Sequence, residues 1–374
     1  MRRQSLDYRR AFLTRQETIV AVFQEGLRKP LYLIDPITDP RWDDLVALHP
    51  DASAFHTRGW LAALKSTYGY KPLVVTSASP TEALTDGVVA CRITSWLTGT
   101  RLVSLPFADH CEPLASDDFQ KSQLCAGLVE TSQDQSCKYL EFRPLLSSAG
   151  LHSDYQSCES FYFHELDLTP GIEKLFKNLH KDSIQRKIRR AEKEQLTYEA
   201  GRTEELIHAF YNLLLITRRR HHLPPQPIDW FRNLTQYMGE GMSVRVARKN
   251  GAAIAAMLTM RHGAKVIYKY GCSDGAFHQL GGMPFLFWKL IEESKATGAA
   301  SLDFGRSEIE NEGLVAFKDK FGTAKRLLTY YRYPRTRKQS ASSWGDSGLA
   351  RRMFSLLPDG VLSAAGNLLY RHIG

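Results

Sequence analysis

The chain has 374 residues, of which 43% are hydrophobic, which is enough for ordinary cores and favours two or three domains. No segment approaches the ~20 apolar residues of a transmembrane helix, and no apolar run with a cleavage site follows the basic start, so we expect neither a membrane span nor a secretory signal. The net charge of +9 favours anionic partners such as phosphates, nucleic acid or an anionic membrane face.

The cysteines and histidines form no pattern typical of a metal centre. The six cysteines are widely scattered without a Cys-x-x-Cys pair, which is typical of reduced core thiols in a cytosolic protein. His221 and His222 have no carboxylate or thiol nearby at ligand spacing, so we expect a solvated loop there. The sequence therefore predicts a cytoplasmic protein with no metal and no tightly bound cofactor.

Hydrophobic periodicity predicts a compact α/β unit over residues 31–155, after a basic extension over residues 1–30. The strands expected in this unit are 31–34, 73–76, 87–95, 101–105 and 138–143. The expected helices are 40–48, 57–67 and 117–133.

A second unit over residues 156–335 follows the same plan, in which helices precede a small sheet and a helix–strand pair completes it. The expected helices are one long basic helix from 170 to about 195, and helices at 203–220, 228–238 and 283–297. The expected strands are 160–166, 243–247, 252–261, 265–272, one through Asp303, and 327–333. Asn250-Gly251 is a strong hairpin signal between two of them. Residues 336–374 are predicted to be a polar linker and an amphipathic tail.

Residues 301–307 combine an apolar strand with charged side chains. Asp303 interrupts the strand, and a buried carboxylate needs a partner, for which Arg306 is the obvious candidate. Phe317 and Lys318 follow on a short helix. These charges converge at the end of a strand, where α/β enzymes tend to build sites. An Asp303–Arg306 pair that only closes the strand is the alternative.

Four segments in order resemble Fem-type transferases and their GNAT-fold relatives with a BioF2-like acetyltransferase domain. They lie at 55–60 with 68–70, at 105–114, at 183–191 and at 301–322. The resemblance implies an α/β (α+β) fold of two tandem GNAT-like domains, each a small mixed sheet flanked by helices, which face each other across a groove. It also implies acyl transfer.

A glycine pair, Gly281-Gly282, lies with Gln279 before an apolar helix. Glycines let a backbone approach a ligand, and a helix N-terminus offers free N–H groups to phosphate. In GNAT enzymes this loop holds the CoA pyrophosphate, so the resemblance implies donor binding by these three residues and by Tyr270 on the preceding strand. The usual glycine pattern is reduced here, and a plain loop–helix turn is the alternative.

The resemblance also implies a role for Lys318. An oxyanion forms when an amine attacks a thioester or ester carbonyl, and a positioned cation lowers that barrier. In Fem-type relatives the lysine of the Phe-Lys pair lies at the reacting centre, and Phe317-Lys318 matches that pair. The alternative is a lysine on the surface of a helix.

The acceptor side of the groove is expected to involve three further places. A strongly basic helix carries Arg186 and Arg190, which the resemblance places along the groove, although a solvated charged helix is the alternative. Asp109 and His110 lie in an irregular loop, where the carboxylate could orient the imidazole as a general base, or the loop could be structural. Trp60 belongs to the first matching segment.

The resemblance therefore implies an acyltransferase that acts on an amine, and we expect the acceptor to be a cell-envelope or exopolysaccharide precursor. Acyl-CoA is the favoured donor because a glycine loop survives. Aminoacyl-tRNA, which Fem-type enzymes use to build peptidoglycan cross-bridges, is the alternative suggested by the basic surface. A non-catalytic polyanion-binding module is the rival from another class. The tail, with basic and apolar residues over 351–371, suits peripheral contact with the inner face of the membrane, or packing on the body of the chain.

Overall fold

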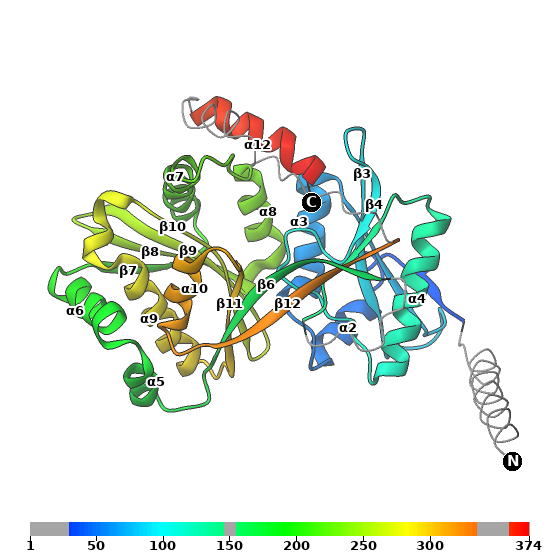
Figure 1. The fold of residues 1–374 in the computed structure, drawn as a ribbon, viewed down its shortest axis with the longest axis horizontal. Helices are drawn as coiled ribbons and strands as arrows, with labels where there is room; N and C mark the ends of the chain where they lie inside the picture. The colour runs from blue at the N-terminus through cyan, green and yellow to red at the C-terminus, as the bar shows by residue number, and fades with distance from the viewer. Residues whose placement is uncertain (1–29, 146–154, 335–358, 374) are drawn as a thin grey trace, which may run out of the picture.

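Residues 30–145, 155–334 and 359–373 are described by the computed structural model, which has a mixed α/β fold. Its sheet has 12 strands in the order β1-β2-β3-β4-β5-β12-β6-β11-β10-β9-β8-β7 (Figure 1). The strands are β1 (Tyr32–Ile34), β2 (Lys71–Thr76), β3 (Val88–Ser95), β4 (Gly99–Val103), β5 (Leu140–Phe142), β6 (Gln156–Asp167), β7 (Thr197–Gly201), β8 (Met242–Lys249), β9 (Ala252–His262), β10 (Lys265–Ser273), β11 (Ser301–Glu308) and β12 (Ala324–Tyr333). The α-helices are α2 (Arg41–Leu48), α3 (Arg58–Tyr68), α4 (Asp118–Asp134), α5 (Ile172–Asn178), α6 (Arg186–Lys193), α7 (Glu204–Arg220), α8 (Ile228–Met238), α9 (Gly282–Ala296), α10 (Glu312–Asp319) and α12 (Asp359–Ile373).

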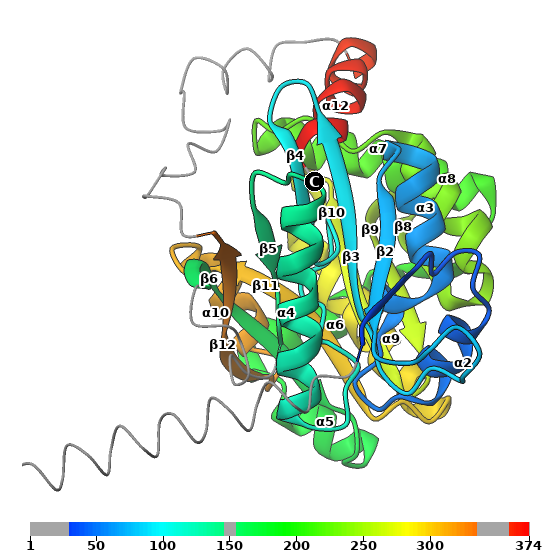
Figure 2. The same cartoon turned by 90° about the vertical axis from the view of Figure 1, so that its right-hand side faces the viewer.

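The long strands β6 and β12 join the two halves of the sheet. They pair with each other along most of their length, and the end of β12 also pairs with β5 through Tyr331↔Phe142 and Tyr333↔Leu140. In Figures 1 and 2 these strands run between the half that carries α4 and the half that carries α9. The sheet is therefore continuous, while the domain boundaries expected at residues 30, 155 and 335 stay a prediction.

One hydrophobic core is shared by the two halves, because α3 packs against α8. Trp60 of α3 and Trp230 of α8 are fully buried, with ring centroids 5.1 Å apart. A Cβ atom on Gly59 would lie 2.5 Å from the carbonyl oxygen of Tyr237, so this glycine permits the close approach of the helices. The prediction that Trp60 lines a groove is therefore wrong, since its side chain lies in this core.

The opposite face of the sheet is covered by α5, α6 and α9, which enclose a second core around the fully buried Phe287. The long basic helix expected from 170 to about 195 is interrupted. α5 ends at Asn178, a π-helical turn spans Lys181–Gln185, and α6 begins at Arg186. The side-chain amide of Gln185 donates to the carbonyl oxygens at the end of α5, which stabilises this break. Strand β7 was not predicted from the sequence.

The C-terminal helix α12 lies across both halves of the molecule. The backbone oxygen of Tyr370 accepts a hydrogen bond from the hydroxyl of Tyr70 at 2.6 Å, while the Tyr370 hydroxyl donates to Pro224. The carbonyl oxygen of His372 accepts from Arg101 at 2.8 Å. Part of the tail thus packs on the body of the chain, and residues 351–357 lie outside the described residues.

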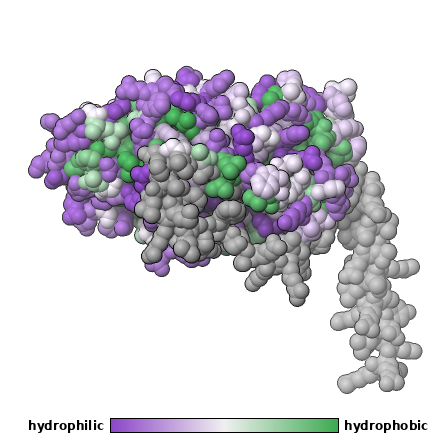
Figure 3. Space-filling model, turned by 90° about the horizontal axis from the view of Figure 1, so that it is seen from above, coloured by the Kyte–Doolittle hydropathy of each residue, from purple (hydrophilic) through white to green (hydrophobic). Residues whose placement is uncertain are grey.

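The surface gives no sign of a membrane-crossing segment within the described part. None of its helices has the length and apolar character that a bilayer span requires. On the face shown in Figure 3, hydrophilic residues predominate and hydrophobic ones are scattered among them.

Candidate active site

The parallel strands β10 and β11 part after a short paired stretch. They pair through Lys265↔Ser301, Val266↔Leu302 and Ile267↔Asp303. Beyond these residues β10 has a bulge between Tyr268 and Tyr270, and β11 has one between Asp303 and Arg306 while it pairs with β6. Bulges re-aim side chains and are frequent beside active sites. The polar residues described below gather at this divergence.

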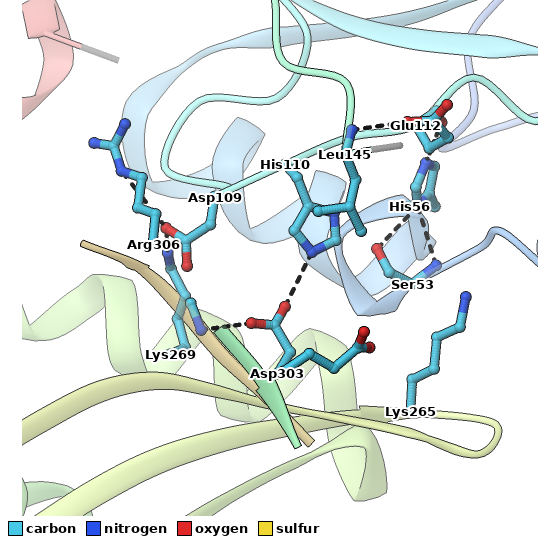
Figure 4. Close-up of polar contacts among 12 residues, drawn as sticks. Ser53, His56, Asp109, His110, Glu112, Leu145, Lys265, Lys269, Asp303 and Arg306 are labelled. Atoms are coloured by element: carbon cyan, nitrogen blue, oxygen red, sulfur yellow. Dashed lines mark hydrogen bonds and ion pairs between the residues drawn. The ribbon is translucent and has the colours of Figure 1, made fainter. Parts of the chain in front are cut away.

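Asp303 on β11 pairs with His110 from the loop after β4. Both side chains are more than nine-tenths buried, and the distance from Nε2 of His110 to Oδ2 of Asp303 is 3.0 Å. The rings of Phe55 and Phe163 pack edge-on against the imidazole, each with its centroid 5.4 Å away, and hold its orientation. Figure 4 shows His110 reaching from one half of the molecule toward Asp303 on the other.

The expected pair between Asp303 and Arg306 does not form. Gly305 has a φ of +71° within the β11 bulge, which changes the direction of the strand between the two residues. The guanidinium of Arg306 instead lies 3.9 Å from the ring centroid of Phe161. Its Nε is 4.0 Å from a carboxylate oxygen of Asp109. The partner of Asp303 is therefore a histidine from the N-terminal half.

Asp109 forms its closest ion pair with Lys269, at the bulge of β10. The distance from Oδ1 to Nζ is 2.9 Å, and both side chains are largely buried. Burial alone would raise the pKa of Asp109, but Lys269 and Arg306 outweigh it and hold that pKa below its usual value. Asp109 is thus ionised and engaged by cations. The suggestion that it orients His110 is not supported, because Asp303 occupies that place.

Lys318 reaches the β11 bulge from α10. Its helix α10 begins at the cap formed by Asn311, whose side chain accepts from the N–H of Leu314. The Nζ of Lys318 donates to the carbonyl oxygens of Gly305 and Arg306, at 2.9 and 2.8 Å. The side chain is 3% exposed, and burial lowers its pKa from 10.5 to about 8, against the opposing effect of Asp109 and Asp303. An amine with this pKa can hold or release a proton near neutral pH.

A polar cavity of about 160 Å³ lies beside the His110–Asp303 pair. Its walls come from the loop before α3, the loop after β4, and strands β6, β10, β11 and β12. The lining residues are Asp51, Ser53, His110, Glu112, Leu145, Phe163, Glu165, Lys265, Ile267, Ser301, Asp303 and Arg326. Figure 4 shows Lys265 extending from its strand toward Ser53 and His56. Within the described residues, no three His, Cys, Asp or Glu side chains gather as a metal site would need.

The glycine pair is arranged differently from the expected open donor loop. Gly281 and Gly282 are both buried. A Cβ on Gly281 would lie 2.5 Å from the carbonyl oxygen of Lys187 in α6, and one on Gly282 would lie 2.9 Å from the Cβ of Ala255. These glycines therefore permit α6 and β9 to pack on the start of α9. The structure thus gives these glycines a packing role, and their expected part in donor binding stays a prediction.

The remaining predicted residues lie apart from the buried cluster or at its margin. Gln279, Arg186 and Arg190 are exposed, and Arg190 pairs with Glu194 at 2.6 Å. Tyr270 accepts a hydrogen bond from Trp230 within the shared core, and its ring lies 5.6 Å from the Nζ of Lys269. Phe317 packs against Phe287 and Phe321 and so helps to fix α10 beneath the bulge.

Five of the predicted residues are brought together by the fold. They are Asp109, His110, Asp303, Arg306 and Lys318. Sequence reasoning missed Lys269, Lys265 and Glu165. Lys269 had a visible signal, since it is a charged residue in the middle of an apolar, aromatic strand.

Comparisons with known proteins concern the domain and the fold. Residues 179–318 match the family described as acetyltransferase (GNAT) domain. The structure resembles that of FemX, with a TM-score of 0.62 and 14% identity, over 81% of this chain and 97% of FemX. It also resembles L-PGS from Bacillus licheniformis, with a TM-score of 0.54 and 14% identity, over 81% of this chain and 94% of L-PGS. A conserved protein of unknown function from Bacteroides thetaiotaomicron is similar at a TM-score of 0.55 and 12% identity, over 81% of this chain and 99% of that protein.

A search of curated proteins gives no match to the sequence. The matched domain begins just before the π-helical turn and ends at Lys318, so it contains β10, the glycine pair, β11 and most of α10. The resemblance to the GNAT-fold relatives of Fem-type transferases is thus confirmed. The chain carries a GNAT acyltransferase domain over residues 179–318.

Proposed function

We propose that this protein transfers an acyl group from an activated donor to a primary amine of a cell-envelope or exopolysaccharide precursor. The observation that carries the proposal is Lys318, a buried amine with a pKa of about 8 at the bulge of β11. It lies in the GNAT domain, and the carboxylates of Asp109 and Asp303 are close enough to act on its pKa.

The site offers groups suited to each stage of such a transfer. The amine attacks the carbonyl carbon, and the carbonyl oxygen takes up negative charge. Protonated Lys318 donates two hydrogen bonds to backbone carbonyl oxygens. Its third N–H and its positive charge can then stabilise that oxyanion. Lys269 and Arg306 add positive charge, which the ionised Asp109 partly neutralises.

Two donors are compatible with this chemistry. The sequence argument for acyl-CoA relied on the survival of a glycine loop, and that argument is weakened because α6 packs against the pair. A specific observation favours aminoacyl-tRNA as the second candidate. α6 presents Arg186, Lys187, Arg189 and Lys193 to solvent, and such a helix suits a long polyanion.

The experiment tests both donors with the same purified protein. Thiol release follows acyl-CoA turnover, and transfer of labelled amino acid follows aminoacyl-tRNA turnover, each in the presence of a mixture of amine acceptors. We expect turnover with one donor and its loss in Lys318→Met. Lys325→Met is the matched control, because Lys325 is exposed and paired with Asp319.

A different result would support the non-catalytic alternative. If neither donor is turned over while RNA binds with an affinity that falls steeply with salt, the chain is a polyanion-binding module and the proposed transfer is wrong.

The proposed acceptor places the protein in the cytoplasm, at the inner face of the membrane. Peripheral contact would come from the basic and apolar residues 351–357, since the end of α12 is held on the body of the chain by Tyr70 and Arg101. Flotation with anionic vesicles tests this contact. The full chain should float, and a chain that ends at Arg337 should not.

A further inference from the structure

The cavity beside His110 is small and has both apolar and charged walls. Its volume of about 160 Å³ is close to that of the ~150 Å³ cavity known to accept benzene, so it fits a group of side-chain size. It lies where the N-terminal loops meet β6, β10 and β11, and Phe163, Leu145 and Ile267 give it apolar walls. A ligand must therefore place a short carbon chain or a small ring there, with its polar end toward His110 and Asp303.

The pair at the base of this cavity has the arrangement of a base and its orienting carboxylate. His110 is 6% exposed and Asp303 is 5% exposed. With Asp303 accepting a hydrogen bond from Nε2, the neutral imidazole carries its lone pair on Nδ1. The N–H of Gly305 donates to the other carboxylate oxygen, which fixes Asp303 in turn.

The charge around the pair favours a cation, because the ammonium of Lys265, which also lines the cavity, is already bound to the carbonyl oxygens of Pro50 and Ala52. Glu165 of β6 lies directly opposite Asp303 in the antiparallel register, so both carboxylates lie on one face of the sheet. Like charges in this position repel each other. The negative charge of Glu165 is only weakly neutralised by Arg326, whose guanidinium nitrogen lies 3.5 Å from the carboxylate oxygen. The same guanidinium also stacks over the ring of Phe163. An ammonium group between Glu165 and Asp303 would relieve the repulsion.

We propose that this cavity binds the acceptor as a primary ammonium on a short aliphatic chain or small ring, and that His110 takes its proton. This inference rests on the proposed function and names the acceptor class of that site. One proton passes from the ammonium to Nδ1 of His110, which leaves a neutral amine. The amine nitrogen then forms its bond to the acyl carbon as the bond from that carbon to the donor's sulfur or oxygen breaks, and the leaving atom takes the second nitrogen proton.

Binding is tested without any transfer reaction. The protein is titrated with n-butylammonium and, separately, with 1-butanol, which has the same shape without the charge. The imidazole NMR signal of His110, identified by its absence from His110→Gln, reports occupancy. We expect n-butylammonium to shift this signal at millimolar concentrations and 1-butanol to leave it unchanged, and Glu165→Gln to weaken the ammonium effect several-fold. Equal effects of the two probes, or no effect of either, would overturn the proposal.

Catalysis is tested with whichever donor the protein uses. His110→Gln should lower kcat/KM for the amine acceptor by roughly 10²–10⁴, the range of general-base catalysis. His164→Gln is the matched control, because His164 is also fully buried and bonded to a carboxylate, that of Asp319, but does not line the cavity.

The two hypotheses fail in different ways. If the wild-type protein turns over no donor, the proposed function fails, and the butylammonium titration alone then decides whether the cavity selects amines. If donor turnover is normal but His110→Gln transfers to amines as well as His164→Gln does, the assignment of His110 is wrong and the proposed function stands.

Discussion

Replacing Lys318 by methionine sets two effects on stability against each other. Methionine keeps the length of the side chain but cannot donate to the carbonyl oxygens of Gly305 and Arg306, now 2.9 and 2.8 Å from Nζ. Each buried acceptor left without a partner costs about 1–3 kcal/mol. Removing the buried charge gains free energy, because a fall in pKa from 10.5 to about 8 corresponds to about 3 kcal/mol at pH values below 8. At pH 7 the free energy of unfolding should therefore change by less than about 3 kcal/mol.

The pH dependence separates the two effects. Between pH 8 and 10.5 the unfolded chain keeps a proton on Lys318 that the folded chain has released, so the unfolded state binds more protons. The free energy of unfolding of the wild-type protein then rises with pH across this window. Lys318→Met lacks this contribution and should lose about 3 kcal/mol relative to the wild type between pH 7 and 10.5.

Urea unfolding of the wild type, Lys318→Met and Lys325→Met at pH 7 and 10.5 measures this difference. The Lys325 variant should follow the wild type, because Lys325 lies on the surface. In the transfer assay, Lys318→Met should lower kcat by roughly 10²–10³, as expected for the loss of one oxyanion donor. Parallel pH dependence in all three proteins would refute the reasoning about the buried charge, and unchanged turnover would remove Lys318 from the reacting centre.

Three further predictions follow from contacts in the fold. Gly282→Ala should lower the free energy of unfolding measured in urea, because the added Cβ would lie 2.9 Å from the Cβ of Ala255. Gly171→Ala is the control and should be close to neutral, because no atom lies within 4 Å of its added Cβ. Asp303→Asn should cost about 1–3 kcal/mol, because its carboxylate now accepts hydrogen bonds from both His110 and Gly305 and the amide has only one acceptor oxygen. Arg306→Ala should cost less than about 1 kcal/mol, because Arg306 is partly exposed and 4.0 Å from its nearest carboxylate. Ending the chain at Arg337 should lower thermal stability, since Tyr70 and Arg101 lose their partners in α12, and an unchanged melting temperature would show that these contacts contribute little.

The strands and the charged end of β11 were predictable, because their signals are local. Alternating apolar residues, turn glycines and the Asn250-Gly251 hairpin placed most of the C-terminal sheet within a few residues of its observed bounds. The same local pattern indicated that Asp303 and Lys318 would lie close together, on a strand and on the helix that follows it.

The partners of these residues were not predictable, because they come from distant parts of the chain. His110 and Asp303 are 193 positions apart, and their contact depends on how the loop after β4 meets β11. Arg306 was nearer in sequence, but the bulge at Gly305 turns it toward Phe161 instead. A short sequence separation was therefore a poor guide here, since one residue with positive φ changed which side chains face each other.

The helix α6 links the packing of the fold to the choice of donor. It covers the glycine pair with the carbonyl oxygen of Lys187, so the start of α9 is occupied by protein where an open phosphate loop was expected. The same helix presents Arg186 and Arg189 outward. Changes at the glycines should consequently act on folding, whereas changes at these two arginines should act on the binding of an anionic donor.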